Sequence, residues 1–209
     1  MVEKSRAMTG FRKLVVVAGV AGALIATAIP LTIISRGVSA KDAPTMVEAF
    51  LARGLRRLAT PAGLRAAANP IPLTPEVLAS ARAHFADHCA SCHGNDGRGQ
   101  TSIGRNLYPK SPDMTLPVTQ GLSDGEIFSI IENGIRLTGM PAWGDGTAES
   151  TRASWELVHL VRHFPKITPE ELAEMAALNP KGRAEFEQEQ AMDAFLKGGD
   201  VKPTHHQSH

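Results

Sequence analysis

The chain has 209 residues and a formal net charge of +1, with 22 Lys and Arg against 21 Asp and Glu. This length allows one modest domain with extensions or two small domains, and the balanced charge excludes a nucleic-acid binder that relies on a strongly basic surface. Hydrophobic residues at 43% and charged residues at 21% exclude a wholly disordered chain, and two cysteines exclude a dense disulfide framework and a four-cysteine zinc site.

The charge is unevenly distributed along the chain. Residues 1–74 carry ten basic and three acidic side chains, whereas residues 75–165 and residues 166–209 each carry three more acidic than basic side chains. A basic N-terminal third before a mildly acidic remainder suggests an N-terminus that meets a membrane.

An uncharged segment of 22 residues occupies residues 14–35. At about 1.5 Å per residue it is long enough to cross a hydrocarbon core of about 30 Å. Arg6, Arg12 and Lys13 precede it, which favours a cytoplasmic location for residues 1–13. We therefore expect a single-pass transmembrane anchor in the cytoplasmic membrane, with the remaining chain on its outer, periplasmic face.

A cleaved signal peptide is the competing interpretation of this segment. Residues Val38, Ser39 and Ala40 resemble a peptidase site, with the cut after Ala40. The apolar run is longer than the roughly 7–15 residues of a signal peptide, which favours the anchor. Both interpretations export the rest of the chain.

Residues 36–73 are expected to form a linker with an amphipathic helix over 42–68. Asp42 is a candidate N-cap, with Pro44 close behind it. Apolar side chains recur at helical spacing at Val47, Leu51, Leu55 and Leu58, and Arg53, Arg56 and Arg57 lie off this stripe. Such a helix fits two locations, either on anionic lipid headgroups or packed on the globular domain. The Asn-Pro-Ile-Pro sequence at 69–72 then marks a domain boundary.

Both cysteines lie in one pentapeptide, Cys89-Ala90-Ser91-Cys92-His93. This spacing is the signature of c-type haem attachment. On a helical turn, residues i and i+3 point the same way, so the two thiols can each add to one vinyl group of a haem. His93 then lies beneath the iron as its proximal ligand. The motif therefore predicts one covalently bound haem c, held by Cys89, Cys92 and His93.

Three other interpretations of the motif compete with haem. A thioredoxin-type redox pair belongs in a βαβ context, and the sequence around the motif has no strand pattern. A zinc site would need further ligands, for which His84 and His88 are close but form no standard pattern. A structural disulfide is compatible with an exported protein. The histidine directly after the second cysteine, followed by Gly94, favours haem.

Met140 is the candidate for the second axial ligand of the iron. It lies in a loop over residues 135–144 that has no helical periodicity, which is an unusual place for a core methionine. Pro141 stiffens the loop, and a stiff loop can hold a weakly binding thioether against iron. Met114 is the alternative ligand.

These residues resemble a class I cytochrome c over residues 74–165. In that family a helix leads into the haem motif, and residues 76–85 match it. A small and an aromatic residue of this helix, matched by Ala81 and Phe85, pack against a C-terminal helix. Residues 155–162 match that C-terminal helix. Residues 123–135 resemble the middle helix of the family, with Ser123 as its cap and Gly134 as its stop. The resemblance implies an all-α domain folded around one haem.

The resemblance also implies how the haem is held. Met140 and Pro141 match the methionine-ligand loop of the family. The proximal histidine of the family donates a hydrogen bond to a proline carbonyl, for which Pro109 is the better match and Pro112 the alternative. Arg105, Tyr108 and Trp143 are either neighbours of the haem edge or surface and packing residues.

Residues 166–209 are predicted to form a helical extension, with helices over 167–178 and 183–196. The apolar side chains of these two helices pack on the haem domain or form a docking surface; they are Leu172, Met175, Ala176, Phe186, Met192 and Phe195. The ending with His205, His206 and His209 favours a disordered tail over a weak metal site. The pairs His84/His88 and His159/His163 are expected to be ordinary helix residues.

The predicted function is one-electron transfer in a respiratory chain on the outer face of the cytoplasmic membrane. No nucleophile or acid–base constellation is visible, so we expect an electron carrier and not an enzyme, with redox-protein donors and acceptors and with no nucleic acid or small-molecule substrate. The first alternative is a dedicated haem subunit of a periplasmic dehydrogenase. The second is a gas-binding haem sensor or enzyme, which requires that Met140 is not a ligand.

Overall fold

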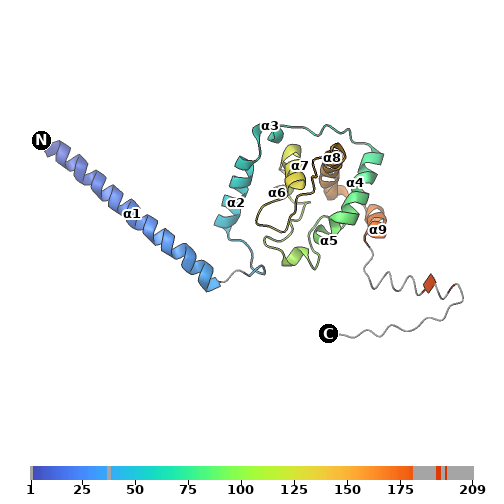
Figure 1. Cartoon of the computed structure of the whole chain (residues 1–209), viewed down its shortest axis with the longest axis horizontal. Helices are drawn as coiled ribbons and strands as arrows, with labels where there is room; N and C mark the ends of the chain where they lie inside the picture. Colours follow the sequence, from blue (N-terminus) through green and yellow to red (C-terminus); the bar gives the residue numbers. More distant parts are fainter. Residues whose placement is uncertain (1, 37–38, 181–191, 194–195, 197–209) are drawn as a thin grey trace. The chain divides into compact units, whose positions relative to one another are not determined.

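The structure is a computed structural model that describes residues 2–36, 39–180, 192–193 and 196 (Figure 1). Within these residues every regular element is helical, which confirms the predicted all-α fold class. The chain divides into two compact units, residues 1–42 and residues 43–209.

The first unit consists of helix α1, Val2–Arg36. It starts well before the uncharged segment 14–35 and includes that segment in full. A search of the described residues finds no helix with the length and apolar character needed to cross a membrane. The transmembrane anchor predicted for residues 14–35 is therefore not supported by the structure.

The second unit begins with helices α2, Met46–Ala59, and α3, Ala62–Arg65. The single helix predicted over 42–68 is thus wrong in two respects. It starts at the cap Thr45, where Thr45 and Glu48 form a reciprocal capping box, and not at Asp42. It breaks at Thr60, because the residue before Pro61 is pushed into the extended conformation, here with φ −76° and ψ 121°.

Helices α4, Pro75–His88, α7, Asp124–Asn133, and α8, Ala148–His163, pack together around the core (Figure 1). Ala81 and Phe85 are 1% and 3% exposed on the side of α4 that packs against α8, as predicted. The ring of Phe128 on α7 stacks on Trp155 of α8 with a centroid distance of 4.2 Å. The shorter elements are α5, Ala90–His93, η1, Gly104–Asn106, α6, Pro117–Gln120, and η2, Phe164–Lys166.

Helix α7 has the limits that its sequence signals predict. Ser123 caps it in a capping box with Glu126, and Gly134 ends it with a φ of 63°. A side chain at Gly134 would collide with the backbone of Pro141, so this glycine also lets the following loop fold back across the helix end.

Helix α9, Pro169–Leu178, is the first predicted helix of the C-terminal extension. Its Met175 is fully buried in the core, so the first half of the extension packs on the domain. The second predicted helix, 183–196, lies outside the described residues except for 192–193 and 196. Phe186, Phe195 and the terminal histidines His205, His206 and His209 also lie outside them.

Candidate haem site

The junction of α4 and α5 places the haem-attachment motif within a single helical turn. Cys89 ends α4 and begins α5, and its carbonyl oxygen accepts hydrogen bonds from the N–H groups of Cys92 at 3.2 Å and His93 at 2.9 Å. The two cysteines are not joined to each other. Three or more His, Cys, Asp or Glu side chains do not come together as a metal site anywhere in the part of the chain that the structure describes. Both thiols and the histidine thus lie on one helical turn, which is the arrangement that attachment of a c-type haem requires.

His93 is buried, with 9% of its surface exposed. Its Nδ1 atom is enclosed and has no hydrogen-bond partner among the described residues. The ring of Phe85 lies 6.2 Å from the His93 ring, centroid to centroid. Burial lowers the pKa of His93 to about 4, because an enclosed imidazole disfavours the cation. The neutral ring is the form that coordinates a metal.

The hydrogen bond expected between His93 and a proline carbonyl is not formed. Nδ1 of His93 contacts neither the Pro109 nor the Pro112 oxygen as a hydrogen-bond donor. A buried polar nitrogen without a partner costs free energy unless another group satisfies it. Among the described residues, the ring of His93 is packed by Phe85 and its Nδ1 has no hydrogen-bond partner.

The thiol of Cys89 is half-buried, and its surroundings disfavour the reactive thiolate. Burial, and to a smaller extent the neighbouring Cys92, raises the pKa of Cys89 to about 12. Redox-active cysteine pairs depend on a lowered thiol pKa, so this environment does not fit the thioredoxin-type interpretation.

The loop after the motif holds the last carbonyl groups of α5. The N–H of Gly99 donates to the His93 carbonyl at 2.7 Å, and the Thr101 hydroxyl donates to the Cys92 carbonyl at 3.1 Å. The Thr101 hydroxyl also accepts a hydrogen bond from the N–H of Gly104 at 2.8 Å. A Cβ atom at Gly104 would lie 2.1 Å from the Cys92 carbonyl oxygen. Sequence reasoning missed Thr101 and Gly104, because only the folded loop brings them against the motif.

Met140 lies half-buried in a tight loop that follows α7. The N–H of Ile135 donates to the Met140 carbonyl at 3.1 Å, and the N–H of Met140 donates to the Thr138 hydroxyl at 3.1 Å. The Thr138 hydroxyl in turn donates to the Ile135 carbonyl at 2.8 Å. Met114, the alternative ligand, packs instead against the hydrophobic core. The structure thus holds Met140 in a hydrogen-bonded loop and Met114 against the core.

The loop is tied to the rest of the domain at both ends. At one end, Gly139 lies directly against the side chain of Leu107, in the segment that follows the haem motif. At the other end, the N–H of Trp143 donates to the Ile131 carbonyl at 3.1 Å, and the N–H of Gly144 donates to the Glu132 carbonyl at 3.0 Å. These contacts fix the methionine loop against both α7 and the loop after the motif.

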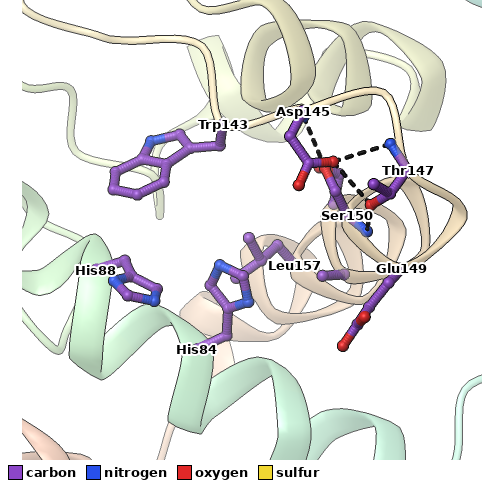
Figure 2. Close-up of a pocket in the computed structure, with 10 residues that line it drawn as sticks. His84, His88, Trp143, Asp145, Thr147, Glu149, Ser150 and Leu157 are labelled. Atoms are coloured by element: carbon purple, nitrogen blue, oxygen red, sulfur yellow. Dashed lines mark hydrogen bonds between the residues drawn. The ribbon is translucent and has the colours of Figure 1, made fainter.

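A hollow of about 320 Å³ lies between α4, α8 and the segment after Met140 (Figure 2). The Trp143 ring lies 5.5 Å from the His88 ring across this hollow, and the rings of His84 and His88 meet edge to face at 5.0 Å. Burial and the neighbouring His88 lower the pKa of His84. Asp145 on the opposite wall is engaged with Thr147 and Ser150 (Figure 2).

The remaining histidines and haem-edge candidates have ordinary protein partners or face solvent. His159 Nε2 binds the Ile71 carbonyl at 2.7 Å, and His163 binds Glu171, as expected for helix residues. The Tyr108 hydroxyl donates to the Glu48 carboxylate, and Arg105 is exposed. These contacts are consistent with surface and packing roles.

An all-helical domain with a buried histidine directly after two cysteines has the features expected of a c-type cytochrome domain of class I. Residues 76–161 match a protein family described as cytochrome C oxidase, cbb3-type, subunit III. The matched region begins in α4 and ends in α8, so it contains the motif and the methionine loop. A search of curated proteins finds no match. The domain accordingly carries a covalently bound c-type haem with iron, serves haem-based electron transfer and has redox proteins as partners.

Proposed function

We propose that the domain passes single electrons between redox proteins, with its haem attached to Cys89 and Cys92 and its iron bound by His93 and Met140. The observation that carries the proposal is the enclosed, neutral His93, whose Nδ1 has no partner among the described residues. When bound, the haem supplies an iron that gains and loses one electron, and ligation by histidine and methionine raises its potential.

The protein's own residues hold the site rigid and dry. Phe85 packs on His93 and on Phe164, with centroid distances of 6.2 Å and 5.0 Å, and so covers part of the His93 ring with apolar surface. The hydrogen bonds around Thr138 limit the movement of Met140. A site that moves little between its two redox states loses little energy to rearrangement, which suits a carrier.

The partners that we propose are a donor and an acceptor in a respiratory chain. The family that matches is described as a subunit of a terminal oxidase, which supports this setting. A carrier needs small and short-lived contacts, so no large docking surface is required. Residues 74–165 are the proposed limits of the electron-transfer domain.

The proposed location is the outer face of the cytoplasmic membrane. Residues 14–35 are uncharged and follow Arg12 and Lys13, a pattern typical of a segment that directs export. The proposal requires only export of the haem domain and holds for an anchor and for a cleaved signal peptide.

The test is the visible spectrum of the reduced, haem-loaded protein with and without carbon monoxide. We expect no change in the native protein, because Met140 fills the sixth position. Met140→Ala should open that position and shift the spectrum with carbon monoxide. Met114→Ala is the matched control and should leave the spectrum unchanged. A spectral shift in the native protein would overturn methionine ligation and favour a gas-binding sensor or enzyme.

A further inference from the structure

Helix α2 lies on the haem domain through its polar side. Arg56 is half-buried, and this burial lowers the pKa of its guanidinium despite the nearby charge of Glu126 on α7. Thr60, at the end of the helix, is 8% exposed. On the same helix Glu48 accepts a hydrogen bond from the Tyr108 hydroxyl. Glu48 and Arg56 thus both interact with the domain from the polar side of α2.

The opposite side of α2 is apolar and open. Six large side chains, which we call the apolar face, are between 56% and 88% exposed: Met46, Val47, Phe50, Leu51, Leu55 and Leu58. At about 3.6 residues per turn they lie on one side of the helix, turned away from Arg56 and Thr60. No residue of α2 itself is buried. Water exposure of six such side chains is costly, and a contiguous patch of this kind marks an interaction site.

The charged side chains around the apolar face indicate which kind of partner binds there. Arg53 and Arg57 are exposed and lie along one edge of the face, at its helical boundary. Glu48 is the single acidic residue of the helix, and Tyr108 already engages it. An apolar face with a basic rim complements the acyl chains and the negative headgroups of a lipid surface.

We propose that α2 binds the surface of an anionic lipid bilayer, with the apolar face inserted at the level of the headgroups. Only residues 37–45 separate α2 from α1 and its uncharged segment 14–35, to which the proposed function assigns export. Because the apolar face is turned away from the domain, this binding places the haem domain on the water side. The proposal does not depend on the identity of the iron ligands.

Hydroxyl-radical footprinting of the full, haem-loaded chain tests this proposal residue by residue. Vesicles of phosphatidylglycerol mixed with phosphatidylcholine should reduce labelling of the apolar face several-fold, whereas vesicles of phosphatidylcholine alone should protect it much less. Leu116 and Leu137, 50% and 93% exposed on other segments, should stay fully labelled and serve as internal controls. The site-resolved readout separates α2 from any binding by α1, and the carbon monoxide test remains an independent measurement.

Three double variants make the test specific. Arg53→Gln with Arg57→Gln should weaken protection on anionic vesicles, whereas Lys110→Gln with Lys166→Gln removes the same charge elsewhere and should not. Phe50→Ser with Leu55→Ser should also weaken it, without loss of stability because both side chains are exposed. Equal labelling of the apolar face with and without anionic vesicles would overturn the proposal. Protection that rises with protein concentration in the absence of lipid would also overturn it, in favour of a second copy of the chain.

Discussion

The protonation state of His93 is set by its burial in the protein. An imidazole in water titrates near pH 6.5, but enclosure beside Phe85 lowers the pKa of His93 to about 4. The same enclosure keeps Cys89 a neutral thiol, with a pKa of about 12. Burial thus keeps the imidazole of His93 neutral, which is the form that coordinates a metal.

Gly97 is the residue where the loop after the motif meets the core most closely. It has a φ of +68°, and a Cβ atom there would lie 2.8 Å from the Phe164 ring, which packs on Phe85. Gly97→Ala should lower the free energy of unfolding by about 2–5 kcal/mol, from backbone strain plus overpacking. Denaturant unfolding of the haem-loaded protein measures this loss.

Gly146→Ala is the matched control for this prediction. Gly146 has a φ of +85° but no atom within 4 Å of an added Cβ. It should therefore cost only the backbone strain, about 1–2 kcal/mol. Equal losses for the two variants would show that the contact with Phe164 does not matter.

Among the elements, α9 is attached to the domain through a buried methionine and one carboxylate. Met175 fills the core, and Glu171 receives hydrogen bonds from Arg82 at 3.0 Å and from His163 at 2.8 Å. Glu171 also completes the capping box of its own helix with Thr168. The helix lies beside α4 (Figure 1), and Glu171 also links it to His163 of α8.

Glu171 should make the docking of α9 dependent on pH. Burial acts to raise the pKa of Glu171, but the hydrogen bonds from His163 and Thr168 and the charges of His163 and Arg82 outweigh burial, so the pKa is lowered. A lowered pKa stabilises the fold at pH values above the unfolded value of about 4.3, and this stabilisation is lost as the pH falls through the folded value.

Glu171→Gln should therefore lower the free energy of unfolding at pH 7 by about 1–2 kcal/mol. It should also flatten the acid side of the stability profile, measured by denaturant unfolding at a series of pH values below neutrality. Glu174→Gln is the control, because Glu174 binds the same Arg82 but is 62% exposed and should cost at most about 0.5 kcal/mol. An unchanged pH profile in Glu171→Gln would contradict the assignment.

On the scale of the whole molecule, one helical unit precedes one haem-binding unit. The segment before the haem motif is part of the second unit and binds α8 directly. Asn69 donates to the Trp155 carbonyl at 2.8 Å, and Ile71 accepts from His159. The electron-transfer domain therefore has an N-terminal strap, residues 60–73, that the family match does not cover.

Export of the haem unit predicts a simple difference between the full chain and a chain without residues 1–40. In spheroplasts of a Gram-negative host, protease added from outside should digest the haem domain of the full chain and should spare the shortened chain. Extraction with alkaline carbonate then separates a retained anchor, which stays in the membrane pellet, from a cleaved signal peptide. Protection of the full chain from the protease would rule out export.

The sequence by itself determined the features that depend on neighbours along the chain. The haem motif, the cap of α7 at Ser123 and its stop at Gly134 all use signals within a few residues, and the structure agrees with the two helix limits. The pairing of Ala81 and Phe85 with a later helix was also predictable, because helical periodicity and the resemblance to a family point to the same face.

Only the tertiary structure decided the features that depend on distant groups. The burial of His93, the packing of Gly104 on Cys92 and the ion pairs of Glu171 each depend on a segment outside the local sequence pattern. The orientation of α2 is the clearest case. Its periodicity shows that one side is apolar. Only the folded domain brings Tyr108 to Glu48 and Glu126 near Arg56, and the apolar face stays exposed.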